Sequence, residues 1–190
     1  DVQNSMKRVL KYCWGNPSSA YVIGKMSAQI IERAREQVAN SINGHSHEIY
    51  FTSCATESNN TVLKSLSYHF YPKKKKIIST PIEHPSVINT LEFLKTQGIV
   101  VQYCPVDSNG RVSAKQVEAM IDEDTFLICC ILANNEIGTI QEIKEISALA
   151  KSKSILVFSD CVQAIGKIPI DVKDLGLDYA TFSAHKLYGP

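Results

Sequence analysis

Apolar residues follow two different spacings along this chain, and the two spacings alternate. Repeats of three and four residues, typical of one helix face, separate short apolar runs that are typical of strands. The helical spacing predicts helices over residues 27–42, 56–70, 85–97 and 143–151, with a further helix that begins at Ser113. The apolar runs predict strands over residues 48–53, 77–80, 99–104, 126–133, 155–159 and 179–182.

This alternation predicts an α/β fold. Helices of about a dozen residues between strands act as crossovers that connect parallel strands. The run over residues 126–133 is apolar at every position, as in a strand buried on both faces. We therefore expect a three-layer helix–sheet–helix domain with a mainly parallel sheet. Because such sheets bind ligands beyond the carboxyl ends of their strands, the loops that follow the strands are the places to search for chemistry.

Two local signals set helix boundaries within this pattern. Gly98 follows the predicted helix at 85–97, at the position where a left-handed residue commonly ends a helix. Ser113 and Gln116 have the three-residue spacing of a capping box, so they mark the start of the next helix.

The composition is that of an ordinary globular domain. The chain has 190 residues, of which 44% are hydrophobic and 21% charged, and its length suits one domain. The formal net charge of +1 gives no reason to expect a nucleic acid or an anionic membrane as partner. No apolar run approaches the roughly 20 residues that span a bilayer, and no signal peptide is visible.

Cysteines and lysines add weaker signals. None of the six cysteines has the C-x-x-C spacing of a zinc site, so no metal site is predicted. This usage favours a reducing, cytoplasmic setting with free thiols. The basic run Lys73–Lys76 is interpreted as a solvated turn, with a docking patch for an acidic partner as the alternative.

The loop at residues 52–57 joins a predicted strand to a predicted helix. The first backbone N–H groups of a helix have no partner within the helix and attract anions, and Thr56 adds a hydroxyl there. A plain helix cap is the alternative. The loop is therefore a candidate anion site.

His84 and the pair Asn134–Asn135 follow two other predicted strands. The proline after His84 restricts the histidine to extended backbone, from which its ring could face a cofactor, and a surface turn histidine is the alternative. A turn explains one asparagine and the nearby glycine, but it explains the full Asn-Asn-Glu-Ile-Gly cluster less well.

Asp160 and Lys186 also follow predicted strands. An acid at the end of a buried strand needs a partner, and a protonated ring nitrogen would be one. Gln163 is close enough in sequence to serve the same ligand, while a helix-capping aspartate is the alternative. A lysine amine in a cleft can lose its proton and bond to an aldehyde, although alone it would be interpreted as a surface lysine.

Together these loops match the four parts of pyridoxal 5′-phosphate (PLP). An anion site, a flat histidine ring, an acid and a lysine suit its phosphate, its ring, its ring nitrogen and its aldehyde. No Gly-x-Gly-x-x-Gly follows a strand for a dinucleotide, and no Walker loop is present for a nucleoside triphosphate. The combination predicts a PLP site around Lys186.

Five motifs occur in an order that points to a family. They lie at residues 16–19 (NPSS), 52–60 (TSCATESNN), 83–85 (EHP), 134–139 (NNEIGT) and 183–190 (SAHKLYGP). With them the chain resembles cysteine desulfurases of the NifS/IscS type, in the class V aminotransferase group of fold type I PLP enzymes. The match covers nearly the whole chain, and the Asn-Asn-Glu-Ile-Gly block is specific to desulfurases within that group.

The resemblance implies roles for residues of these motifs. Lys186 would hold PLP covalently and His84 would stack on its ring, which makes these two the catalytic candidates. Asp160 would keep the ring nitrogen protonated, and Gln163 would bond the phenolic oxygen. Asn135 would lie near the cofactor oxygen and the substrate carboxylate. The phosphate would be held by Ala55, Thr56, Ser183 and His185.

The resemblance also implies a reaction and partners. The family takes L-cysteine, removes a proton from Cα and transfers the sulfur to a cysteine nucleophile, which gives L-alanine and an enzyme persulfide. The sulfur then passes to an iron–sulfur cluster scaffold or to thiolation. We therefore expect a cytoplasmic, homodimeric transferase. One alternative is a selenocysteine lyase or another class V enzyme, and a second is a non-catalytic fragment with a structural or binding role.

Two features depart from the family pattern. Cys54 stands where the family usually has glycine, beside the phosphate. The family's nucleophilic cysteine and its carboxylate-binding arginine lie downstream of the position of Pro190, and none of the six cysteines present aligns with that nucleophile. We therefore expect residues 1–190 to be a partial PLP-binding large domain, without the family's C-terminal small domain and inactive by itself.

Overall fold

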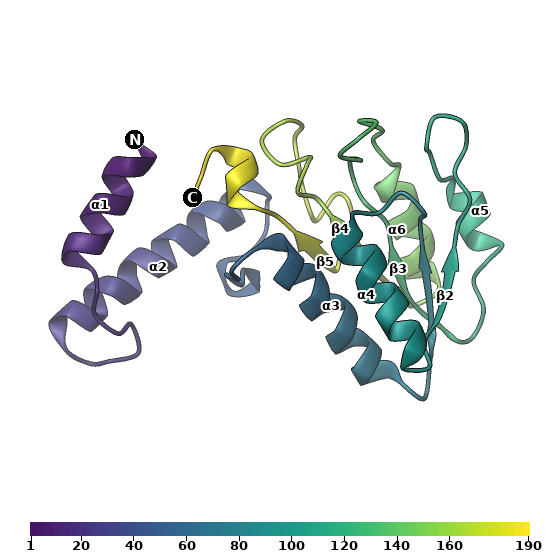
Figure 1. Cartoon of the computed structure of the whole chain (residues 1–190), viewed down its shortest axis with the longest axis horizontal. Coiled ribbons are helices and arrows are strands. Elements are labelled where there is room, and N and C mark those ends of the chain that lie inside the picture. The colour runs from purple at the N-terminus through teal and green to yellow at the C-terminus, as the bar shows by residue number, and fades with distance from the viewer.

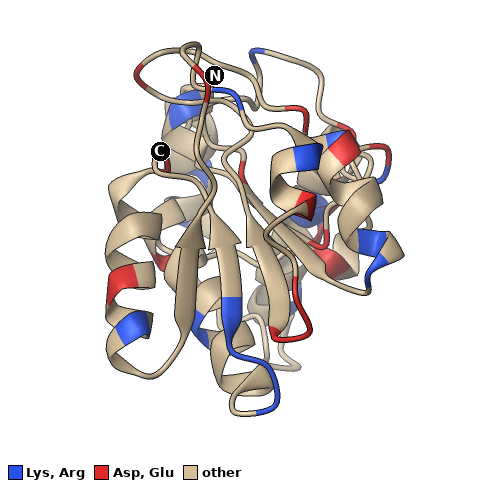
Figure 2. Cartoon of the chain, turned by 90° about the vertical axis from the view of Figure 1, so that its right-hand side faces the viewer, with Lys and Arg blue, Asp and Glu red and all other residues tan.

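Five parallel strands form the sheet at the centre of the computed structural model, which describes all 190 residues (Figure 1). The strands lie in the order β2-β1-β3-β4-β5, and every neighbouring pair is parallel. Their bounds are β1 Lys76–Ser79, β2 Val100–Tyr103, β3 Thr125–Cys129, β4 Leu156–Asp160 and β5 Tyr179–Thr181. Because the strands point the same way, their last residues gather at one end of the sheet (Figure 2), which we call the carboxyl end, opposite the amino end.

Four helices cover the two faces of this sheet, two on each face. The pairs are α3 (Ala55–Phe70) with α4 (Pro85–Thr96), and α5 (Ala114–Glu118) with α6 (Ile143–Ser152). Alternate residues of the same strands pack under each pair, because successive side chains of a strand point to opposite faces. These residues are Ile77, Leu127 and Phe158 under α3 and α4, and Ile78, Ile128 and Val157 under α5 and α6. The predicted three-layer arrangement is confirmed.

The two local boundary signals are also confirmed. Gly98 has a φ of +91°, in the left-handed region that glycine tolerates. The side chain of Ser113 accepts from the backbone N–H of Gln116 at 3.2 Å, and the side chain of Gln116 accepts from the N–H of Ser113 at 3.0 Å. Both ends were predictable because they depend only on neighbouring residues.

The strand predicted at residues 48–53 is wrong. The segment consists of the end of a 3₁₀ turn, η1 (Ser46–Glu48), followed by backbone that pairs with no strand. A helix side chain holds it instead: the guanidinium of Arg35 donates to the carbonyl of Ile49 and lies over the ring of Phe51. Tyr50 and Phe51 are 82% and 55% exposed and lie outside the core, whereas Ile49 packs against its edge.

The strand predicted at residues 126–133 is shorter than expected. β3 ends at Cys129, yet residues 130–133 stay buried and continue beside β4. The N–H of Leu132, for example, donates to the carbonyl of Asp160 at 3.0 Å. The apolar run therefore indicates burial, and the buried segment extends beyond the residues of β3 that pair as a regular strand.

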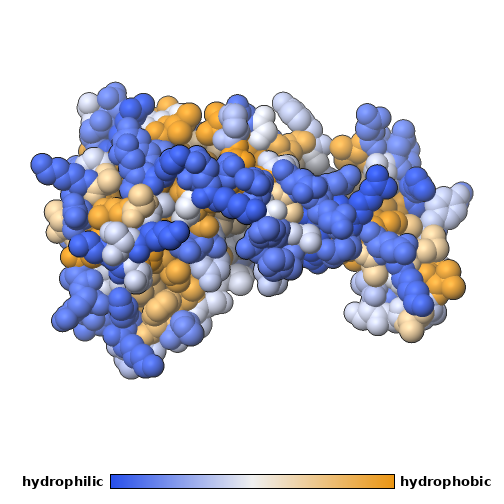
Figure 3. All heavy atoms as spheres, turned by 180° about the vertical axis from the view of Figure 1, so that it is seen from behind, coloured by the Kyte–Doolittle hydropathy of each residue, from blue (hydrophilic) through white to orange (hydrophobic).

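The first two helices form an arm beside the body of the domain (Figure 1). They are α1 (Val2–Tyr12) and α2 (Val22–Ser41), and α2 begins earlier than the predicted start at residue 27. No residue of α1 is buried, and the arm exposes apolar side chains (Figure 3). Leu10, Trp14 and Val22 are 75%, 71% and 73% exposed, so most apolar positions of the arm lie outside the core, with Ala39 near the end of α2 as a buried exception.

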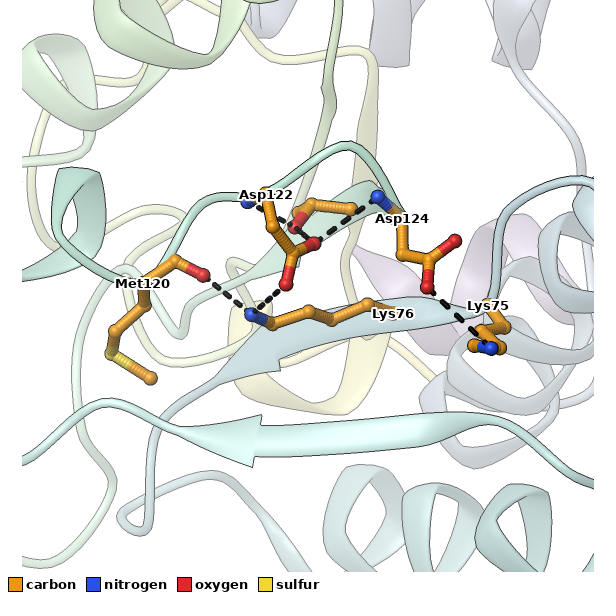
Figure 4. Close-up of polar contacts among 6 residues, drawn as sticks. Lys75, Lys76, Met120, Asp122 and Asp124 are labelled. Atoms are coloured by element: carbon orange, nitrogen blue, oxygen red, sulfur yellow. Dashed lines mark hydrogen bonds and ion pairs between the residues drawn. The ribbon is translucent and has the colours of Figure 1, made fainter.

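The basic run Lys73–Lys76 ends inside β1, at the amino end of the sheet. The prediction of a solvated turn is wrong for Lys76, because its residue is only 8% exposed. Its ammonium lies 2.7 Å from a carboxylate oxygen of Asp122 and donates to the carbonyl of Met120 at 2.5 Å (Figure 4). The pairing makes burial of this charge possible.

Two further features of the whole chain concern membrane-spanning helices and cysteines. No helix combines the length and the apolar character that crossing a membrane requires. All six cysteines are free thiols, and four of them are buried: Cys104, Cys129, Cys130 and Cys161.

Candidate functional site

Asp160 is the last residue of β4, at the carboxyl end of the sheet, and it is 3% exposed. One carboxylate oxygen accepts from the backbone N–H of Val162 at 3.0 Å, and the other accepts from the side-chain amide of Asn59 at 3.0 Å. No α-helix follows Asp160, so the alternative of a helix-capping aspartate does not apply. The strand thus delivers a buried, hydrogen-bonded carboxylate to the candidate site.

His84 caps the start of α4, immediately before Pro85. Its φ of −59° and ψ of 146° are the extended values that a following proline favours. The ring nitrogen Nδ1 accepts from the backbone N–H of Ser86 at 3.1 Å and lies 2.7 Å from its hydroxyl. The side chain is exposed, so the rest of the ring is accessible to a ligand.

Asn59 and Ser86 join these two residues, and sequence reasoning did not single out either of them. Asn59 lies in the second turn of α3, is completely buried, and donates from the same amide nitrogen to Ser86 at 2.9 Å and to Asp160 at 3.0 Å. A signal existed, because Asn59 lies four residues before the buried Leu63 and so falls on the apolar stripe of its helix.

The start of α3 lies in the loop that was predicted as an anion site. The helix begins at Ala55, followed by Thr56, and no side chain caps it. Cys54, the N-cap residue, has a φ of −168°, which is extended backbone that any residue adopts. The departure from glycine therefore causes no backbone strain. Ala55 and Thr56 remain candidates for binding an anion, since uncapped N–H groups attract negative charge.

The loop after β5 carries the other predicted phosphate and aldehyde residues. Ser183 is buried, and its hydroxyl lies 2.8 Å from Nδ1 of His185. Lys186 follows in the 3₁₀ turn η2 (Ala184–Leu187) and is half-buried. None of the five ion pairs of the chain involves Lys186, so its amine is free to meet a ligand.

Hydrogen bonds link only four of the predicted residues: Asp160 to His84 through Asn59 and Ser86, and Ser183 to His185. Gln163 and Asn135 lie outside both groups. The side-chain carbonyl of Gln163 accepts from the ammonium of Lys167 at 2.8 Å. Asn135 is exposed, whereas its neighbour Asn134 is buried and donates to the carbonyl of Ile82 at 2.8 Å. Of the two adjacent amides, Asn134 therefore builds the loop and Asn135 is the one accessible to a ligand.

Glu83 is a buried acid that sequence reasoning left without a role. One of its oxygens accepts from the hydroxyl of Thr80 at 2.7 Å and from the N–H of Ile131 at 2.8 Å, and the other has no partner. Burial raises the pKa of Glu83 to about 8, so the carboxyl is largely protonated at neutral pH. It ties the loop that carries His84 to the end of β3.

Several buried polar atoms at this end of the sheet have no hydrogen-bond partner. They are Oδ1 of Asn59, Oε2 of Glu83 and Oγ1 of Thr181. Thr181 ends β5 and pairs in register with Asp160, so these groups surround the ends of neighbouring strands. Because buried polar groups are normally satisfied, such atoms mark a place where function competes with stability.

The fold defines the class first: its architecture is that of fold type I PLP enzymes, with the candidate residues in the loops at the carboxyl end. A family model for aminotransferase class V matches residues 1–190, and the chain belongs to that family.

Individual proteins of this family are similar to most of the chain. The cysteine desulfurase IscS of Clostridium botulinum is 44% identical over 177 residues, which are 93% of this chain and 45% of that protein. A solved NifS-like protein has a TM-score of 0.97 and 45% identity, over all of this chain and 52% of its own. SspA, solved in complex with cysteine, has a TM-score of 0.96 and 38% identity, over all of this chain and 55% of its own. The chain spans about half the length of the curated relatives it matches.

Proposed function

We propose that the whole protein is a PLP-dependent cysteine desulfurase, which converts L-cysteine to L-alanine and a protein-bound persulfide, and that residues 1–190 supply its cofactor-binding half. The observation that carries the proposal is the convergence at one end of the sheet of a buried carboxylate on Asp160, an uncapped helix start at Ala55 and an unpaired amine on Lys186. The similarity to proteins named cysteine desulfurase supports the same assignment.

The chemistry of the residues present fits PLP. The carboxylate of Asp160 suits a protonated ring nitrogen, and the amine of Lys186 suits the aldehyde. The phosphate would be held by the start of α3, at Ala55 and Thr56, with Ser183 and His185. Gln163 would bond the phenolic oxygen, and Asn135 would lie near the substrate carboxylate. When bound, PLP supplies an electron sink that stabilises negative charge at the substrate Cα.

His84, Lys186 and Asp160 would each have a separate role in the reaction. His84 covers one face of the ring site and fixes its orientation. Lys186, which has no internal partner, is placed to hold or move a proton once its amine is desolvated. Asp160, oriented by two hydrogen bonds, would face the ring nitrogen.

We assign the persulfide to a cysteine outside residues 1–190. Desolvation raises the pKa of all four buried thiols, that of Cys161 to about 12, which disfavours the reactive thiolate. Cys54 is exposed, and the nearby backbone N–H of Glu57 at the helix start lowers its pKa, but it lies at the start of α3 where the phosphate would bind. The four buried cysteines therefore suit packing, and Cys54 belongs to the helix start that would anchor the phosphate.

The proposal also includes a substrate, a second subunit and a sulfur acceptor. The substrate is L-cysteine, in keeping with the cysteine complex of the similar SspA. The apolar side chains exposed along α1 and α2 support a homodimer, since patches of this kind are usually covered. A sulfur acceptor such as an iron–sulfur scaffold and a cytoplasmic location complete the proposal.

The test is Lys186→Ala in the full-length protein, with Lys144→Ala as the control, because Lys144 pairs with Asp174 at the surface. Added PLP should give a lysine-dependent absorption band in the wild type and the control but not in Lys186→Ala. Release of L-alanine from L-cysteine should fall by at least about 100-fold, the scale of a lost acid–base group. An unchanged band in Lys186→Ala would refute the assignment.

A further inference from the structure

Four polar side chains form a continuous hydrogen-bonded row from Asp160 to His84. The amide nitrogen of Asn59 lies 3.0 Å from Oδ2 of Asp160 and 2.9 Å from the hydroxyl of Ser86. That hydroxyl lies 2.7 Å from Nδ1 of His84. Asn59 is 0% exposed and Ser86 is 9% exposed, so water does not compete for the two hydrogen bonds that Asn59 donates.

The backbone N–H of Ser86 fixes the direction of the hydrogen bonds in this row, because it can only donate to Nδ1 of His84. Asn59 presents its NH₂ to both neighbours, with one hydrogen for the carboxyl oxygen of Asp160 and the other for the hydroxyl of Ser86. Because the hydroxyl of Ser86 accepts from Asn59, its own hydrogen is free to point at Nδ1 of His84. The backbone N–H of Ser86, 3.1 Å from the same nitrogen, can also only donate.

Nδ1 of His84 therefore faces two donors and must be the ring nitrogen without a hydrogen. A neutral imidazole has one donor and one acceptor nitrogen, so the hydrogen lies on Nε2. We propose that Asn59 is a positioning residue that, through Ser86, holds His84 in the Nε2–H tautomer and couples its ring to the carboxylate of Asp160. The tautomer follows from the hydrogen bonds of this chain alone, whereas its consequence for catalysis rests on the proposed function.

Such coupling has a use at a cofactor site. The residue that would face the ring nitrogen and the residue that would stack on the ring come from different loops, after β4 and before α4. Asn59, on a third element, sets their relative position with both hydrogens of one amide. The Nε2–H of His84 then points away from the row, where it can donate to a substrate or to an acceptor of the second half of the enzyme.

The test measures the tautomer directly. The full-length protein is labelled with ¹⁵N-histidine, and long-range ¹H–¹⁵N correlation spectra are recorded at a pH where His84 is neutral, with His84→Gln used for assignment. In the wild type, Nδ1 should resonate in the unprotonated range and Nε2 in the protonated range. In Asn59→Ala the hydroxyl of Ser86 loses the donor that orients it, which leaves the backbone N–H of Ser86 as the only fixed donor to Nδ1, so both resonances should move toward intermediate values. The opposite tautomer in the wild type, or wild-type resonances in Asn59→Ala, would overturn the proposal.

Two further variants separate positioning from folding. Ser86→Ala keeps the bond between Asn59 and Asp160 but removes the link to His84, so it should also shift the resonances. Asn60→Ala is the matched control, because Asn60 is the next residue on α3 and donates only to the carbonyl of Thr56 at 2.9 Å. Unshifted resonances in Ser86→Ala, or an equal shift in Asn60→Ala, would contradict the role of the row.

Kinetics then connect the row to the reaction. Asn59→Ala and Ser86→Ala should lower kcat for L-alanine release by about 10- to 100-fold, the scale of a misplaced catalytic group, with a smaller change in KM. If the resonances shift as expected but the wild type releases no L-alanine from L-cysteine, the proposed function fails and the positioning role stands. If the wild type is active and the variants keep both resonances and kcat, the positioning role fails alone.

Discussion

Lys76 and Lys186 lie at opposite ends of the sheet and differ in whether their ammonium groups have partners within the chain. At the amino end, Lys76 is buried and its ammonium has a carboxylate partner on Asp122 and a carbonyl partner on Met120. At the carboxyl end, Lys186 is half-buried and has no ion-pair partner within the chain. The difference teaches that the chain satisfies its own polar groups where it needs stability, and leaves them free where a ligand is to bind.

Carboxyl groups show the same contrast. Asp122 at the amino end accepts from Lys76 and from the hydroxyl of Thr125, at 2.7 Å and 2.9 Å. Glu83 at the carboxyl end has one oxygen without any partner, as do Asn59 and Thr181 in the same region. Unsatisfied groups of this kind cost stability, and they are concentrated where the proposed cofactor would lie.

The largest predicted effect is a pH dependence that has opposite signs at the two ends. Burial raises the pKa of Glu83 from its ordinary value near 4.5 to about 8, so the folded protein keeps a proton that the unfolded chain releases. Between these two values stability therefore falls as pH rises, by up to about 3 kcal/mol from pH 5 to pH 8 for this group alone. The hydrogen bond from Lys76 lowers the pKa of Asp122, so its contribution is instead lost as pH falls below its ordinary range.

Urea unfolding of the full-length protein at several pH values checks this prediction. Glu83→Gln, whose amide is neutral at every pH, should flatten the decline between pH 5 and pH 8. Asp122→Asn should leave that decline in place and remove part of the loss at low pH. A wild-type decline that persists in Glu83→Gln would show that another group titrates there.

The second prediction compares the loss of Lys76 with the loss of Lys186. Lys76→Met leaves Asp122 and a carbonyl without their donor and should lower the free energy of unfolding by about 1–3 kcal/mol, toward the lower value because Asp122 is half exposed. Lys186→Met removes no internal partner and should change it by no more than about 0.5 kcal/mol in the cofactor-free protein. Denaturant unfolding of both variants measures the difference. An equal loss of unfolding free energy in the two variants would contradict the contrast between the two ends of the sheet.

Sequence reasoning singled out candidate residues in loops that follow strands and passed over residues that reach the same end of the sheet from elsewhere. Asp160 stood out because an apolar run stops just before it, and Lys186 because it lies in the loop that follows β5. Asn59 was not, since its partners lie 27 and 101 residues away along the chain. Burial of Lys76 depends in the same way on Asp122, 46 residues later. Local pattern predicted most of the strands and helices, but pairings between distant segments appear only in the fold.

The strand predicted at residues 48–53 failed for a related reason. A short apolar run favours a strand only where a neighbouring strand is available for pairing. Here the segment meets Arg35 of α2 instead of the sheet. The capping box at Ser113, by contrast, is complete within four residues of sequence and was predicted correctly.

The smallest predicted effect compares the starts of two helices. Ser113 caps α5 through its side chain, whereas Cys54 at the start of α3 makes no side-chain cap. Ser113→Ala should therefore lower the free energy of unfolding by about 1 kcal/mol, the usual value for a lost cap, while Cys54→Ala should leave it nearly unchanged. With PLP bound, however, Cys54→Asp should weaken cofactor binding, because its carboxylate would take the N–H groups that the phosphate needs and would repel it. Denaturant unfolding and PLP titration separate the two effects. If Cys54→Ala costs as much as Ser113→Ala, the start of α3 is already satisfied within the chain, and the anion site loses its physical basis.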